Sequence, residues 1–308
     1  MRSTILSLIL LLLTTLAHTQ TLYTKALGNP ANEPVIFLHG GPGSSSANFE
    51  KAAAQKLADN GFYVVFYDRR GEGRSIDPNA RYNFQQTFDD LNALYKTYGL
   101  QKANIIGFSF GGIIATLYAD KYTDHVSSLL LVSSLLSLQE TYTTIIRASK
   151  KIYQANNDTA NLHDIAMMEK LDRNSMAFRS NCFKHASQNG FFATPTPNAL
   201  AQSIYADFKR DTAYTRLQAQ KSEASAGFWK SEHYTNIDIT LRLKQLRAKG
   251  LKIYALYGKD DRLYSRQQIA VLQKLIGKDH LEYLDSASHY LYNDRQTAFI
   301  DAMNKWIK

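Results

Sequence analysis

The segment from Asn104 to Ala115 constrains the fold more than any other part of this 308-residue chain. It begins as a short apolar strand, turns sharply at Ser109 and continues directly as a helix. Gly107 and Gly111 flank the serine at the two positions where a side chain would collide with such a turn. In this context the pattern G-x-S-x-G predicts a nucleophile elbow, which presents a serine hydroxyl at the end of a sheet strand. The five residues alone are common by chance, so the flanking strand and helix give the pattern its weight.

Strands and helices alternate on both sides of this segment. Further apolar strands are expected over residues 34–38, 62–67, 126–132, 251–257 and 280–284, with helices over 46–59, 83–98 and 265–276 and at the end of the chain. Near-continuous apolar strands joined by helices predict an α/β fold with a mostly parallel central sheet flanked by helices on both faces. From about residue 134 to 236 the alternation stops and helical patterns rich in aromatic and basic residues replace it. We therefore expect a core domain of residues 20–133 and 237–308, with a helical cap inserted over 134–236.

The N-terminus has the composition of a targeting segment. Arg2 precedes an apolar run from Ile5 to Leu16, and small residues follow. The run is short for a membrane span, so the pattern predicts a secretory signal peptide over residues 1–19, cleaved after Ala17 or Thr19. An uncleaved anchor is the alternative. The expected protein is exported, periplasmic or secreted, with no stable membrane insertion after cleavage.

Composition narrows the classes of partner. The net charge is +9, but the basic residues are dispersed and no nucleic-acid fold signature accompanies them, which argues against a nucleic-acid partner. The only cysteine, Cys182, excludes an internal disulfide. There is no H-E-x-x-H, no Cys/His cluster and no complete dinucleotide fingerprint, so neither a metal nor a cofactor is predicted. The sequence leaves the oligomeric state open.

A serine nucleophile needs a base and an orienting acid, because an isolated hydroxyl is a poor nucleophile at neutral pH. After an elbow serine, the acid and then the histidine follow along the chain. His289 lies beyond the last expected strand and is the candidate base. Asp260 and Asp261 both follow the strand before it. Asp261 is favoured, because the third residue beyond the turn glycine, Gly258, usually points back to the histidine in such folds.

Acyl transfer also needs fixed donors for the oxyanion, each of which lowers the barrier by roughly 3–4 kcal/mol. The backbone N–H of Phe110, directly after Ser109, is one candidate. The second is expected from the loop His39-Gly40-Gly41-Pro42-Gly43, where glycines let the main chain approach the substrate. Gly41 is preferred to Gly40. The alternative for this loop is a plain tight turn after a strand.

The chain resembles the proline iminopeptidase family of α/β-hydrolases through three motifs: the His39–Gly43 loop, Asp68-Arg-Arg-Gly-Glu-Gly-Arg-Ser75 and the Ser109 elbow. The resemblance covers about residues 30 to 308 and is strongest in the first 110. It implies the α/β-hydrolase fold and release of an N-terminal proline from a small peptide.

Two departures from the family pattern bear on the substrate. Phe108 and Phe110 stand where the family segment G-G-S-W-G has glycine and tryptophan. Glu232-His233-Tyr234 matches only part of the family's E-N-H-Y. The family binds the free amino terminus of its substrate with cap carboxylates, so Glu232 is either that ligand or a solvated carboxylate.

These residues predict a serine hydrolase that works through a Ser109–His289–Asp261 triad and an acyl-enzyme. A proline iminopeptidase-like aminopeptidase acting on short peptides is the leading interpretation, and a carboxylesterase acting on small esters is the alternative. A non-catalytic binding protein with a hydrolase fold is the interpretation from another class. The intact serine, aspartate and histidine argue against it, although fold alone would not.

Overall fold

The computed structural model describes residues 22–220 and 222–308, so the expected signal peptide lies outside the described residues. In this part of the chain one sheet has the strand order β1-β3-β2-β4-β5-β6-β7. Every neighbouring pair is parallel except β1 with β3. The strands are β1 (Thr24–Leu27), β2 (Glu33–Leu38), β3 (Phe62–Tyr67), β4 (Ala103–Phe108), β5 (Val126–Val132), β6 (Lys252–Gly258) and β7 (Leu281–Leu284).

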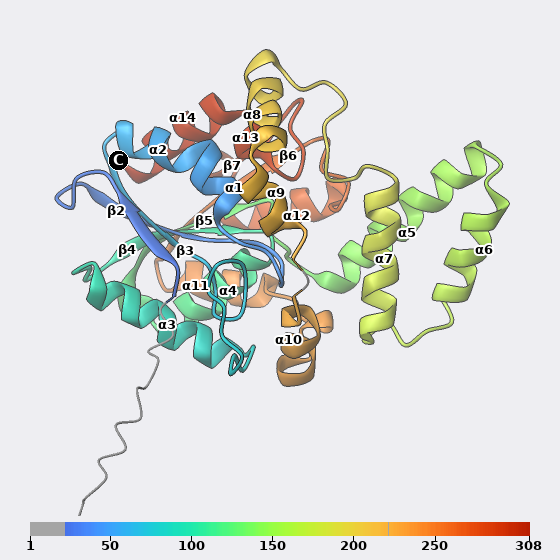
Figure 1. Cartoon of the computed structure of the whole chain (residues 1–308), viewed down its shortest axis with the longest axis horizontal. Helices are drawn as coiled ribbons and strands as arrows, with labels where there is room; N and C mark the ends of the chain where they lie inside the picture. The colour runs from blue at the N-terminus through green and yellow to red at the C-terminus, as the bar shows by residue number, and fades with distance from the viewer. Residues whose placement is uncertain (1–21, 221) are drawn as a thin grey trace, which may run out of the picture.

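Alternate residues of the strands enter two separate cores, because successive side chains of a strand point to opposite faces of the sheet. In β2, Ile36 and Leu38 belong to one buried cluster, and Val35 and Phe37 to the other. Figure 1 shows α3, α4 and α11 on one side of the sheet, and α1, α2 and α14 on the other. The expected α/β-hydrolase architecture is therefore confirmed.

The helices that surround the sheet also supply its crossovers. Their bounds are α1 (Ala47–Phe49), the π-helical η1 (Glu50–Ala54), α2 (Gln55–Asp59), α3 (Phe84–Thr97), α4 (Phe110–Lys121), η2 (Thr123–His125), α11 (Thr240–Ala248), α12 (Arg266–Ile276), η4 (Lys278–His280), α13 (Leu291–Asp294) and α14 (Gln296–Ile307). None of the described helices is both long and apolar enough to cross a membrane.

The segment between β5 and α11 is helical. It contains α5 (Leu138–Ala155), α6 (Thr159–Met168), α7 (Met176–Gln188), α8 (Ala199–Arg210), α9 (Thr212–Gln218), α10 (Ala224–Glu232) and η3 (Tyr234–Asn236). Helices α5, α6 and α7 project away from the sheet in Figure 1, whereas α8 lies beside α13. An isolated antiparallel bridge between Ser137 and Asp238 joins the two ends of this segment. The division of the chain into a core and a cap stays a prediction.

Candidate active site

The candidate catalytic residues all follow strands of the parallel part of the sheet. Ser109 comes directly after β4, Asp261 follows β6 and His289 follows β7, while the His39–Gly43 loop follows β2. The carboxyl ends of parallel strands meet at one edge of a sheet, which is where ligands bind in open α/β folds. The topology therefore places these segments at the same edge.

The turn at Ser109 has the strained geometry expected of an elbow. Its φ is 53° and its ψ is −119°, in a region that non-glycine residues rarely adopt. A Cβ on Gly107 would lie 2.6 Å from the Cα of Gly112, and one on Gly111 would lie 2.8 Å from the carbonyl oxygen of His39. Ser109 N also donates to the carbonyl oxygen of Val132 at 3.1 Å. Neighbouring segments thus require both glycines and hold the serine in place.

The structure pairs His289 with Asp261. The two atoms His289 Nδ1 and Asp261 Oδ2 are 2.8 Å apart, and the residues are 4% and 2% exposed. The other carboxylate oxygen, Asp261 Oδ1, accepts from the amide of Leu263 at 3.2 Å. Asp260 is directed elsewhere, because its Oδ2 accepts from Thr194 Oγ1 at 2.6 Å. Of the two candidate acids, only Asp261 contacts the histidine.

The loops that carry Asp261 and His289 are packed backbone against backbone at Gly258. A Cβ at this glycine would lie 2.5 Å from the carbonyl carbon of Ala287. Asp260 N donates to the carbonyl oxygen of Ala287 at 2.9 Å, which joins the same two loops. Gly258 therefore does more than make a turn, since it permits the approach that brings the acid to the base.

Aromatic rings enclose the imidazole of His289. The rings of Phe108, Phe192 and Tyr264 lie 5.0, 5.4 and 6.4 Å from it, measured between centroids. Ser109 follows Phe108 directly and is 8% exposed. Within the described residues its hydroxyl makes no hydrogen bond, including none to His289. Such contacts are often long in enzymes without substrate and tighten in the complex.

The loop between β2 and α1 reaches the serine through its glycines. A Cβ on Gly40 would lie 3.1 Å from Ser109 Cβ, so a larger residue there would crowd the nucleophile. Gly41 has a φ of 108°, a conformation that favours glycine. Phe110 is the first residue of α4, and the first amides of a helix have no partner within it. The amides proposed for the oxyanion therefore lie on segments adjacent to Ser109.

A buried ion pair that sequence reasoning missed supports this loop. Arg69 Nε lies 2.8 Å from Glu72 Oε1, and the two side chains are 2% and 0% exposed. Through its other nitrogens, Arg69 donates to the carbonyl oxygens of His39 and Gly40. Glu72 Oε2 accepts from the amide of Gly43 at 2.6 Å. The pair thus holds both ends of the glycine loop beside the nucleophile.

His39 completes this support as a neutral imidazole. Its Nε2 accepts from the amide of Arg69 at 3.0 Å, and its Nδ1 donates to the carbonyl oxygen of Gly40 at 3.0 Å. Burial, together with the positive charge of Arg69, holds the pKa of His39 well below its usual value. Protonation would remove the acceptor for the Arg69 amide.

Glu232 forms a hydrogen bond within the protein, which neither of its two sequence interpretations, amine ligand or solvated carboxylate, included. Its Oε1 accepts from the amide of Phe84 at 2.7 Å, at the first residue of α3. The side chain of Asn83 caps the same helix by accepting from the amide of Gln86. Glu232 Oε1 thus caps α3 in this structure, on a side chain that is half-buried.

A cavity of about 700 Å³ borders the end of the glycine loop at Gly43. Its walls come from residues 43–45, from the 71–82 loop and from Leu217, Gln218, Gln220, Ser222 and Glu223, and they include neither Ser109 nor His289. Among the described residues, no group of three or more His, Cys, Asp and Glu side chains is arranged to hold a metal ion.

Comparisons with known proteins agree with the fold. A family model described as "alpha/beta hydrolase fold" matches residues 33–295. The chain is 25% identical over 291 residues to a protein named proline iminopeptidase from Elizabethkingia meningoseptica, covering 93% of each chain. It superposes on a proline iminopeptidase-related protein from Thermus thermophilus with a TM-score of 0.68 at 19% identity, covering 93% and 94% of the two chains. An esterase from Exiguobacterium antarcticum matches with a TM-score of 0.60 at 18% identity, covering 93% and 95%.

Proposed function

Because the chain belongs to the α/β-hydrolase-fold family, we propose that this hydrolase is a serine enzyme that works through an acyl-enzyme. Ser109 is the nucleophile, His289 the general base and Asp261 the residue that orients the base. The observation that carries the proposal is the buried 2.8 Å contact between His289 Nδ1 and Asp261 Oδ2, on loops at the sheet edge that also holds the strained serine.

Each step of the proposed reaction has a residue assigned to it. With Nδ1 donating to Asp261, the Nε2 atom of His289 is left as the acceptor for the Ser109 proton. Ser109 Oγ attacks the substrate carbonyl, and the amides of Gly41 and Phe110 stabilise the negative charge on its oxygen. The proton on His289 then passes to the leaving group. Water, deprotonated by His289, releases the acyl group and regenerates the serine.

A peptidase resembling the proline iminopeptidases is the first candidate for the specific activity. The similarity to a protein of that name extends over 93% of both chains, which supports a shared reaction. The substrate would be a short peptide with an N-terminal proline, whose carbonyl carbon Ser109 attacks.

A carboxylesterase acting on small esters is the second candidate, and the position of Glu232 favours it. An aminopeptidase needs carboxylates for the amino terminus of its substrate, but Glu232 is engaged by the amide of Phe84. Phe108 and Phe110 flank the nucleophile with apolar rings that also suit an acyl group without an amine.

The test compares kcat/KM for a fluorogenic proline amide and a short-chain p-nitrophenyl ester, with Ser109→Ala as the control. We expect turnover of at least one substrate and loss of nearly all of it in Ser109→Ala, with the thermal melting curve unchanged. Preference for the amide supports the aminopeptidase, and turnover of the ester alone supports the esterase. Failure of a fluorophosphonate to label Ser109 would favour the non-catalytic binding protein instead.

A further inference from the structure

Arg179, on helix α7, carries a positive charge that the fold does not neutralise. Within residues 22–220 and 222–308 no carboxylate lies within 4 Å of its guanidinium, and its buried Nε has no hydrogen-bond partner. Two neighbouring lysines are paired, since Lys150 lies 2.7 Å from Glu169 and Lys184 lies 2.8 Å from Asp164. A buried donor without an acceptor is unfavourable, and the side chain as a whole is only half-buried, so its guanidinium can be reached by a ligand.

Aromatic contacts connect Arg179 to both sides of the candidate active site. Its guanidinium lies 5.3 Å from the ring of Tyr234, which is itself 5.3 Å from the ring of Phe110, the residue after the nucleophile. The guanidinium also lies 4.8 Å from the ring of Phe183. Arg179 is therefore held on the faces of two aromatic rings, one of which contacts the nucleophile segment.

The second connection runs from Phe183 to the base. The ring of Phe183 lies 6.4 Å from that of Phe192, and Phe192 lies 5.4 Å from the imidazole of His289. Arg179 is thus connected to His289 through the rings of Phe183 and Phe192. In such a setting a charge–charge contact is screened less than at the surface.

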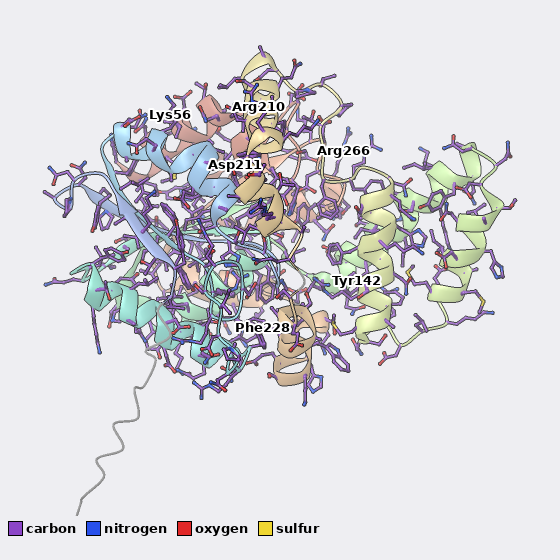
Figure 2. The ribbon with its side chains drawn as sticks, viewed as in Figure 1. Lys56, Tyr142, Arg210, Asp211, Phe228 and Arg266 are labelled. Atoms are coloured by element: carbon purple, nitrogen blue, oxygen red, sulfur yellow. The ribbon has the colours of Figure 1, made fainter. Side chains whose placement is uncertain are left out.

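Tyr142 adds a second unpaired donor. The residue is fully buried in α5, yet its hydroxyl has no hydrogen-bond partner among the described residues. Its ring contacts that of Phe183 at 6.2 Å, the same ring that lies under Arg179. Burial raises the pKa of Tyr142, and the positive charge of Arg179 opposes that shift. Figure 2 marks Tyr142 where α5 and α7 meet the α/β domain, and Phe228 on neighbouring α10.

We propose that Arg179 and Tyr142 form a subsite for a carboxylate of the substrate, so that the enzyme prefers small acyl compounds that carry one. The inference rests on the proposed serine hydrolase. A guanidinium matches a carboxylate with two parallel hydrogen bonds, and a tyrosine hydroxyl can donate a third. The carboxylate belongs either to the acyl part, as in a dicarboxylic half-ester, or to the leaving group, as at the C-terminus of a dipeptide.

The experiment uses two substrate pairs that differ in this charge. For the acyl side, mono-p-nitrophenyl glutarate is compared with p-nitrophenyl pentanoate, and for the leaving side, prolyl-glycine with prolyl-glycinamide. In at least one pair, Arg179→Gln is expected to lower kcat/KM for the charged member about 10- to 100-fold, mainly through KM. The neutral member should stay within about twofold, Arg179→Lys should retain part of the preference, and Tyr142→Phe should cause a smaller loss.

Arg173→Gln is the matched control. Arg173 belongs to the same helical region and stacks on Phe178 at 5.0 Å, but its guanidinium is bonded to Gln139 and Thr143. The variant Arg173→Gln should leave kcat/KM unchanged for both members of both substrate pairs. Equal effects of Arg179→Gln on charged and neutral members, or a wild-type preference for the neutral member of both pairs, would overturn the inference. Turnover that persists in Ser109→Ala would instead overturn the proposed function, whatever Arg179 does.

Discussion

Arg69 Nε lies 2.8 Å from Glu72 Oε1 with both side chains buried, and the pair is bonded to the two ends of the loop beside Ser109. Arg69→Met would leave the Glu72 carboxylate buried without its cation. We expect the free energy of unfolding to fall by about 3–5 kcal/mol, because removing one partner leaves an uncompensated charge. Guanidinium chloride titration measures the loss.

An exposed ion pair provides the control for this prediction. Lys150 pairs with Glu169 at 2.7 Å, and each side chain is 38% exposed, so solvent screens the interaction. Lys150→Met should therefore cost clearly less stability than Arg69→Met. Equal losses would mean that burial of the Arg69–Glu72 pair has no special effect on the loop.

The two neighbouring aspartates should differ sharply in their effect on turnover. Asp261 contacts His289, whereas Asp260 contacts Thr194. Asp261→Asn should lower kcat by roughly 10⁴-fold, because the amide stabilises the wrong tautomer of the histidine. Asp260→Asn should leave kcat within about threefold. The measurement is kcat for both variants on the substrate that the wild type prefers, and a reversed order would assign the acid to Asp260.

His39 should make stability depend on pH. The pKa of His39 is lowered in the folded state. Between the folded and the unfolded pKa, the unfolded chain is therefore protonated at this residue and the folded chain is not. The stability that neutral His39 contributes is fully present above the ordinary pKa of about 6.5. It is lost as the pH falls toward and through the lower pKa of the folded state. Below pH 6.5 the free energy of unfolding should decline by up to ~1.4 kcal/mol per pH unit from this residue.

The control for that pH dependence is His39→Gln. The glutamine side chain can still accept from the amide of Arg69 but does not titrate. Urea unfolding between pH 7.5 and 5 should show a shallower decline in this variant. If wild type and variant declined in parallel, His39 would not be the group responsible.

Glu232 gives a direct test of the amine-ligand interpretation. Glu232→Gln keeps an oxygen acceptor for the amide of Phe84, whereas Glu232→Ala removes it and should destabilise the protein by about 1 kcal/mol. If the residue serves only as a cap, Glu232→Gln should leave KM for a proline amide unchanged. A large rise in that KM, with neutral esters unaffected, would restore Glu232 as an amine ligand.

We also propose that residues 1–19 contain an export signal, which is cleaved after Ala17 or Thr19. Expression of the full chain in a bacterial host, followed by N-terminal sequencing of the exported protein, should show a start at His18 or Gln20. Recovery of the protein in the membrane fraction with Met1 retained would support the uncleaved anchor.

The parts of the fold that depend on short-range chemistry could be predicted from the chain alone. Apolar runs such as 62–67 and 126–132 specify buried strands, and Gly107 and Gly111 specify the turn at Ser109, because the steric requirements are local. The strand β1 (Thr24–Leu27) escaped prediction, since this short edge strand lacks a continuous apolar run. The positions of Ser109 and His289 after their strands followed from the same local patterns.

Tertiary structure alone settled the contacts between residues that are distant in the chain or locally indistinguishable. Asp260 and Asp261 share one turn, and the loop after β7 selects Asp261 because Gly258 lets the two backbones meet. Arg69 and Glu72 have the local pattern of an exposed charged loop, yet both are buried against the glycine loop after β2. The residues around Glu232 in the sequence could not reveal that its carboxylate accepts from the amide of Phe84, which lies 148 positions away. Periodicity and turn sterics act over a few residues, whereas burial and pairing depend on which segments the sheet brings together.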